Sequence, residues 1–228
     1  MGLTYLGDSR PVFEPAGPRM VYTIPSFVPL EVGDLLLVIL VSDETENNAG
    51  IAAAGWTLIA ADAGTSAHVR VWAHHAGPAE PTSVDVLLGT TTLERVGVML
   101  HFRGGGSIPG VLEAGSFADF AATTTPPIPA TISQQANIQF ALVTIETSAA
   151  IVGFTGWATA DTYVSAVLST RRLVVLYRLV RTGVIAGATG LVGPAASGFA
   201  WTAILPARAP FEPGGLVDLV PGNIGLIP

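Results

Sequence analysis

The sequence contains no cysteine. Disulfides, thiolate nucleophiles and cysteine-ligated metals are therefore excluded. The redox compartment stays open, because a chain without thiols tolerates oxidising and reducing surroundings alike.

Charge is scarce as well. Charged residues make up 12% of the 228 positions and half of the residues are apolar, whereas an ordinary soluble domain is about 25% charged. A chain with so little charge has to cover its surface, either in a membrane or against other protein chains. The net charge is −7, and no cationic cluster is present that would neutralise a phosphate backbone. We therefore expect no nucleic-acid partner.

Long apolar runs are missing. A membrane helix needs about 18 or more consecutive apolar residues, and the prominent run 35–41 has only seven. We therefore expect no membrane partner. Assembly into a larger protein object, together with other copies of the chain, is the favoured interpretation.

Extended helical periodicity is also missing. Short apolar or alternating runs follow one another, separated by turn-forming residues every 8–15 positions, and this spacing is typical of an all-β fold. The run 34–42 opens after Gly33 and closes at the polar stretch 43–48, which suits a strand buried on both faces. Its flanks and β-branched residues favour a strand over a short buried helix. The pattern predicts a two-sheet antiparallel β-sandwich, jelly-roll-like.

The two halves of the chain resemble each other. Residues 34–43 align with 137–146, and residues 55–57 align with 156–158, both at offsets slightly above 100 residues. A pseudo-duplicated half explains this match, and a chance similarity of two β-rich halves is the alternative. Either explanation leads to two sheets packed face to face.

These patterns divide the chain into three parts. We expect an irregular lead-in over residues 1–19 and a β-sandwich domain over 20–208, with pseudo-repeat halves at about 33–103 and 137–206. An extended apolar arm is expected over 209–228.

The arm is predicted from its composition. Residues 206–228 contain five prolines and four glycines, which prevent a regular element, yet many of the others are apolar. A disordered tail would be polar, so we expect this segment to lie on its own domain or, as the low charge favours, on another subunit. The predicted partner-binding residues of the arm are Phe211, Leu216, Val217, Leu219, Val220, Ile224, Leu226 and Ile227.

No set of residues has the spacing of an active site. Four histidines are present, His68, His74, His75 and His101. His68 and His74 share a strand face, but no third metal ligand lies near them in the sequence, and we expect exposed strand histidines. We expect no catalytic residue, no metal and no cofactor.

The aromatic residues offer one possible binding surface. Trp56 and Trp157 each follow a glycine at a strand start, a placement that favours core packing. Trp72 and Tyr177 are the candidates for stacking on a sugar. A carbohydrate-binding or host-adhesion module on a phage tail is the alternative function that depends on them.

Four segments together resemble a known group of proteins. They are Gly33-Asp34-Leu35-Leu36-Leu37, Gly55-Trp56-Thr57-Leu58, Val69-Arg70-Val71-Trp72-Ala73 followed by Gly77 and Pro81, and Ala200-Trp201 with Leu205 and Arg208. This succession resembles the β-sandwich modules of tailed-phage virion proteins over about residues 20–208. The resemblance implies a non-enzymatic structural role on the virion surface, as a capsid decoration (cement) protein or a tail-associated subunit. The implied partners are other copies of the chain and a major capsid or tail protein.

Overall fold

A computed structural model describes the chain in fifteen segments. They are residues 4–9, 19–24, 28–42, 49–63, 68–88, 95–103, 113–123, 131–133, 139–147, 150–153, 158–164, 172–180, 183–185, 191–193 and 196–205. These segments hold strands and turns and no helix, so none of them contains a helix that would span a membrane. The all-β class that the sequence predicts is confirmed for this part of the chain.

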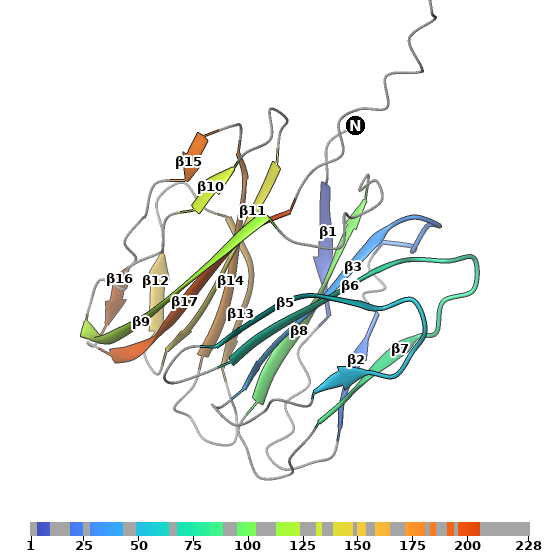
Figure 1. Ribbon diagram of the computed structural model, residues 1–228, viewed down its shortest axis with the longest axis horizontal. Coiled ribbons are helices and arrows are strands. Elements are labelled where there is room, and N and C mark those ends of the chain that lie inside the picture. Colours follow the sequence, from blue (N-terminus) through green and yellow to red (C-terminus); the bar gives the residue numbers. More distant parts are fainter. Residues whose placement is uncertain are drawn as a thin grey trace, which may run out of the picture.

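The N-terminal half builds two antiparallel sheets (Figure 1). The larger has the order β1-β8-β3-β6-β5, with β1 at Thr4–Asp8, β8 at Arg95–Arg103, β3 at Leu35–Ser42, β6 at His68–His75 and β5 at Thr57–Ala63. The smaller has the order β2-β7-β4, with β2 at Arg19–Thr23, β7 at Ser83–Leu87 and β4 at Gly50–Ile51.

The C-terminal half builds a second five-stranded sheet and two short ladders. The sheet has the order β13-β14-β11-β17-β9, with β13 at Ala158–Val164, β14 at Arg172–Val180, β11 at Gln139–Thr147, β17 at Ala196–Leu205 and β9 at Glu113–Thr123. The ladders pair β10, Thr131–Ser133, with β15, Gly183–Ile185, and β12, Ala150–Gly153, with β16, Leu191–Gly193.

Strand β3 is the centre of the first sheet because its apolar run is unbroken. All of Leu35–Ser42 is buried, and β3 pairs with β6 on one side and β8 on the other. Successive side chains point to opposite faces of a strand, so Leu36, Val38 and Leu40 share one face. They pack in a core cluster with Tyr22 and other residues of the small sheet. Full burial of each such aliphatic side chain stabilises the fold by about 1.5–3 kcal/mol.

The opposite face of the first sheet is equally apolar. Leu37 and Ile39 of β3, Val71 of β6 and Leu100 of β8 have 0% exposure. The small sheet covers the other face, so these side chains need a second cover. β5 lies against β9 and β1 lies against β13, and the two five-stranded sheets lie next to each other in Figure 1. The two five-stranded antiparallel sheets are thus packed together, as predicted, while the jelly-roll connectivity stays a prediction.

The two five-stranded sheets have the same strand order. Reading the second sheet backwards gives β9-β17-β11-β14-β13, which matches β1-β8-β3-β6-β5 position by position in the order of the chain. The contacts between the two sheets obey the same equivalence. Strand β1 contacts β13, and the strands equivalent to them, β9 and β5, also contact each other. The observed order is the one that a duplicated sequence would produce. The equivalence includes β1 and β9, which lie outside the predicted repeat boundaries of 33–103 and 137–206.

The expectation of an irregular lead-in over 1–19 is wrong for Thr4–Asp8. This segment is strand β1, which pairs with β8 and carries a register shift just before Gly7. Ser9 prolongs the contact: its amide donates to the carbonyl oxygen of Met99 at 2.8 Å, and its hydroxyl accepts from the Met99 amide at 3.0 Å. Gly7 follows this irregularity, and glycine is typical of loops, so the segment looked irregular in the sequence.

Candidate functional site

A groove of about 410 Å³ opens where β2 ends, between the segment 28–30 and the turn 77–82. Its apolar lining consists of Ile24, Val28, Pro29, Leu30, Pro78 and Pro81. The Ile24 amide donates to the carbonyl oxygen of Thr82 at 3.0 Å and so ties the end of β2 to the turn. Ligand sites in proteins have about 300–1,000 Å³ and mostly apolar linings, so the groove has the size and character of a binding site.

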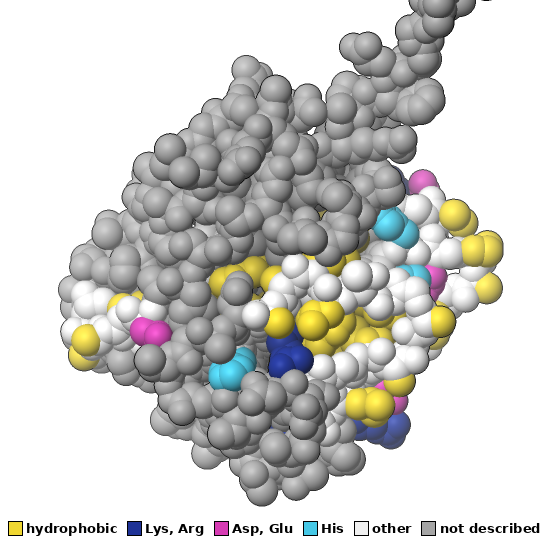
Figure 2. Space-filling view, viewed as in Figure 1, with side chains coloured by type: hydrophobic (Ala, Val, Ile, Leu, Met, Phe, Trp, Pro, Cys, Tyr) yellow, Lys and Arg dark blue, Asp and Glu magenta, His cyan; other side chains and the backbone are white. Residues whose placement is uncertain are grey.

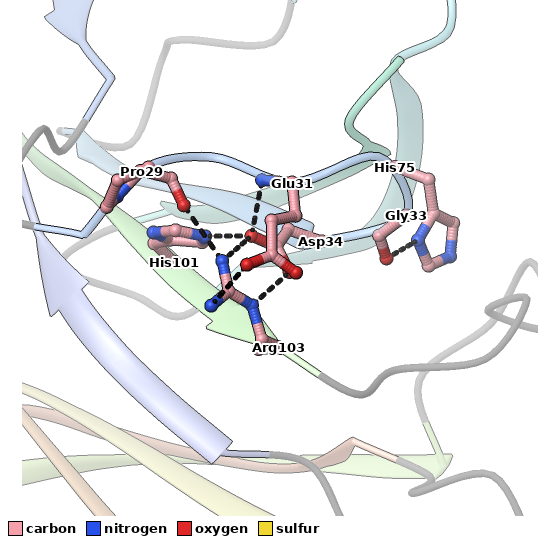
Figure 3. A network of polar contacts seen from close by, with 7 residues as sticks. All are labelled: Pro29, Glu31, Gly33, Asp34, His75, His101 and Arg103. Atoms are coloured by element: carbon pink, nitrogen blue, oxygen red, sulfur yellow. Dashed lines mark hydrogen bonds and ion pairs between the residues drawn. The ribbon is translucent and has the colours of Figure 1, made fainter. Parts of the chain in front are cut away.

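The first wall of the groove is fixed by the carboxylate of Asp34. Asp34 follows Gly33, whose φ of 89° lies in the left-handed region that favours glycine. Figure 3 shows the carboxylate surrounded by donors: the Glu31 amide at 2.9 Å, Nε and Nη2 of Arg103 at 3.0 Å each, and Nε2 of His101 at 2.8 Å. Burial raises the pKa of Asp34, but these donors outweigh it and hold the pKa below its ordinary value.

Arg103 links the Asp34 carboxylate to the segment that forms the groove wall. Its Nη2 donates to the carbonyl oxygen of Pro29 at 2.8 Å, and its Nη1 lies 2.9 Å from Oε1 of Glu31. The hydrogen bond to Asp34 raises the pKa of Arg103 above its ordinary value. The segment that supplies Pro29 is therefore held against the end of β8 by a permanently charged side chain.

The second wall is fixed by Glu80. Its Oε1 accepts a short hydrogen bond from the Gly77 amide and lies 2.8 Å from Nε2 of His74 on β6. Burial raises the pKa of Glu80, but the Gly77 amide and His74 outweigh it, so the pKa lies below its ordinary value. The turn that carries Pro78 and Pro81 is closed on itself and anchored to β6.

His74 links this wall to a third turn. Its Nδ1 lies 3.0 Å from the carbonyl oxygen of Gly55, and its ring stacks on Trp56 with centroids 5.1 Å apart. Both ring nitrogens thus lie beside oxygen atoms, the carbonyl of Gly55 and the carboxylate of Glu80. The β4–β5 turn and the groove wall share one anchoring side chain.

Backbone hydrogen bonds join the bases of the two walls. The Gly33 amide donates to the carbonyl oxygen of Ala76, and the Ala76 amide donates to that of Asp34, each at 2.8 Å. The two walls therefore rest on the same edge of the first sheet. A groove anchored in this way is preformed, and an occupant does not have to order its walls.

The residues predicted to stack on a sugar do not form such a site. Trp72 is 4% exposed and belongs to the core cluster with Val38 and Met99, so its predicted role in ligand stacking is wrong. Strand alternation places it on the face of β6 that the small sheet covers. Tyr177 lies in β14, but its side chain is outside the described part of the structure, as are the predicted arm residues between 211 and 227.

The expectation of exposed histidines is wrong, because His68, His74 and His75 are half-buried and His101 is buried. The His101 side chain is 1% exposed and faces the buried Asp34 carboxylate. Such a pair, closed to solvent, holds the segment before β3 and has no access to a substrate. No group of three metal-ligating side chains occurs among the described residues. The lining of the groove is mostly apolar, with Thr23, Glu80 and Thr82 as its polar side chains.

Comparisons with known proteins add nothing to this picture. No protein-family model matches the chain, and searches of curated proteins and of solved structures find no match. The function has to be inferred from the residues themselves.

Proposed function

We propose that the chain is a non-enzymatic structural subunit of a tailed-phage virion, most closely a capsid decoration (cement) protein. It binds a major capsid or tail protein together with other copies of itself. The observation that carries this proposal is the preformed apolar groove on a chain in which only 12% of the residues are charged. Both features suit a protein that works by covering surfaces.

The exposed surface supports the same function. Val32, Leu58 and Leu87 are large hydrophobic side chains with 71%, 43% and 48% exposure. Figure 2 shows several patches of hydrophobic side chains on the described part of one face, with few charged side chains between them. Burial against neighbouring subunits would remove this apolar surface from water.

The stabilising mechanism would be burial of area. Apolar surface removed from water contributes about 25 cal/mol per Å², and a standard protein interface covers about 1,600 Å². Many such contacts around a shell would resist outward pressure without a covalent bond. The walls of the groove, already held by Asp34 and Glu80, would lose little conformational entropy on binding.

The adhesion module on a phage tail is less well supported. It requires exposed aromatic side chains beside polar ones, and Trp72, one of its two candidate residues, is buried in the core. Among the described side chains, the exposed large hydrophobic ones are Val32, Leu58 and Leu87, and none of them is aromatic.

The proposal is tested on particles. Virions banded on a density gradient from the strain that encodes the chain are probed by immunoblotting and by immunogold electron microscopy. We expect the chain to follow the major capsid protein at constant ratio across the band, with label on the outside of the particle. A chain that stays entirely in the soluble fraction of the lysate would refute a virion role.

A further inference from the structure

We propose that the groove between segment 28–30 and turn 77–82 accepts residues 219–227 from the arm of a second copy of the chain. This inference rests on the proposed function, because it names the place where neighbouring subunits hold each other. Three features of the chain support it: the apolar lining of the groove, the uncharged sequence of the arm and the position of the end of β17.

Three of the polar groups around the groove already have partners. The Thr82 carbonyl oxygen accepts from Ile24, the Pro29 carbonyl oxygen accepts from Arg103, and the Glu80 carboxylate is held by Gly77 and His74. An occupant therefore has no need to supply a charge to them. The larger part of the surface that remains to be covered is the apolar lining, including the three proline rings. The groove therefore favours an uncharged, apolar occupant.

The arm contains a stretch with these properties. Residues 219–227 read Leu-Val-Pro-Gly-Asn-Ile-Gly-Leu-Ile, without a single charged side chain. Binding this stretch would bury no unpaired charge, which would otherwise cost several kcal/mol. Pro221 prevents the segment from continuing as a helix, and an extended segment presents alternate side chains to a groove.

The position of β17 favours a second copy over the same chain. Strand β17 ends at Leu205 in the second five-stranded sheet, and the first five-stranded sheet lies between it and the β2–β7 pair (Figure 1). The docking stretch begins 14 residues after Leu205, so its start lies within about 50 Å of the end of β17. Because the first five-stranded sheet stands between β17 and the groove of the same molecule, the groove of a neighbouring copy can be approached more directly.

The absence of cysteine makes a clean disulfide test possible. Three single variants of the full chain are prepared: Thr82→Cys in the exposed rim of the groove, Ile224→Cys in the arm, and Ala121→Cys as an exposed control on β9. Thr82→Cys and Ile224→Cys are mixed and oxidised, and the disulfide-linked peptides are quantified by mass spectrometry. The control mixture contains Ala121→Cys and Ile224→Cys.

We expect the 82–224 disulfide to form at least about tenfold faster than the 121–224 disulfide, because docking raises the effective concentration of the two thiols. Equal rates in the two mixtures would overturn the inference. So would a double variant, Thr82→Cys with Ile224→Cys, that closes its disulfide within one chain at high dilution as fast as at high concentration.

The oligomeric state of the unmodified chain separates this inference from the proposed function. If the chain is an oligomer and the two disulfides form equally fast, the groove is not the acceptor although the assembly role stands. If light scattering finds only monomers over the whole concentration range, both the assembly role and the groove fail.

Discussion

The carboxylate of Asp34 lies 3.0 Å from both Nε and Nη2 of Arg103, although 69 residues separate the two in the sequence. This paired contact connects the turn before β3 to the last residue of β8. Asp34 is 2% exposed, so its charge depends on Arg103 and His101 for compensation. The contact decides whether the first wall of the groove is rigid.

Replacing Asp34 by Asn is expected to lower the free energy of unfolding by about 1.5–3 kcal/mol, the range for hydrogen bonds to charged groups, because the buried side chain loses its charge-assisted contacts with Arg103 and His101. The Asn amide would also place a donor opposite the donors of Arg103. Urea unfolding followed by circular dichroism measures the change.

The matched control for this variant is Asp85→Asn. Asp85 pairs with Arg19 at 3.0 Å, but the two side chains are 39% and 61% exposed, and such surface pairs contribute at most about 1 kcal/mol. If both substitutions had the same small effect, Asp34 would not anchor the wall.

Acid should weaken the fold through Asp34 and Glu80. The pKa of each carboxyl is lower in the folded chain than its ordinary values of 3.8 and 4.5, so the unfolded chain binds more protons at acid pH. Their contribution is present above those ordinary values and is lost as the pH falls through the folded-state values. Each group changes the free energy of unfolding by at most about 1.4 kcal/mol per pH unit.

The measurement is a series of urea unfolding curves between about pH 6 and pH 2. The double variant Asp34→Asn with Glu80→Gln should show a flatter decline than the unmodified chain. An unchanged slope would mean that these two carboxyls do not carry the acid sensitivity.

Gly97 on β8 is expected to tolerate no side chain. A Cβ there would overlap the hydroxyl of Tyr22 and lie 2.6 Å from the carbonyl oxygen of Ile39. Gly97→Ala should therefore cost about 1–3 kcal/mol, the range for overpacked cores. Gly50→Ala is the control, since a Cβ at Gly50 meets nothing within 4 Å. Thermal unfolding of both variants tests this, and equal midpoints would show that β2 is not packed closely on β8.

The burial of Trp72 makes a further prediction. Trp72→Ala should lower the free energy of unfolding by about 3–5 kcal/mol, as expected for a large core side chain. Trp56 is half-buried and stacks on His74. Its replacement by Ala should lower the free energy of unfolding by only about 1–2 kcal/mol. Denaturant unfolding compares the two, and a Trp72 variant as stable as the unmodified chain would argue for a surface role.

The sequence predicted the strands whose apolar pattern is continuous. The run 35–41 identified β3 because burial on both faces requires apolar residues at every position. The sequence pattern does not predict strand β9, Glu113–Thr123, because its sequence EAGSFADFAAT is rich in small and polar residues. The residues of β9 have little intrinsic preference for a strand, and the segment is a strand because it pairs with β17.

The groove could not be predicted from local spacing. In the sequence Asp34 only opens the run 34–42, because its partners His101 and Arg103 are 67 and 69 residues away. His74 and Glu80 are six residues apart, a spacing that matches no known motif. Only the register of β3 with β6 and β8 brings these side chains to one edge of the sheet.

If the chain works as an assembled subunit, as proposed, its mass in solution has to exceed that of one chain. Sedimentation equilibrium should give a multiple of the 23.4 kDa chain mass, and a variant without residues 209–228 should shift toward the monomer. A mass of 23.4 kDa for the full chain at every concentration would contradict the account.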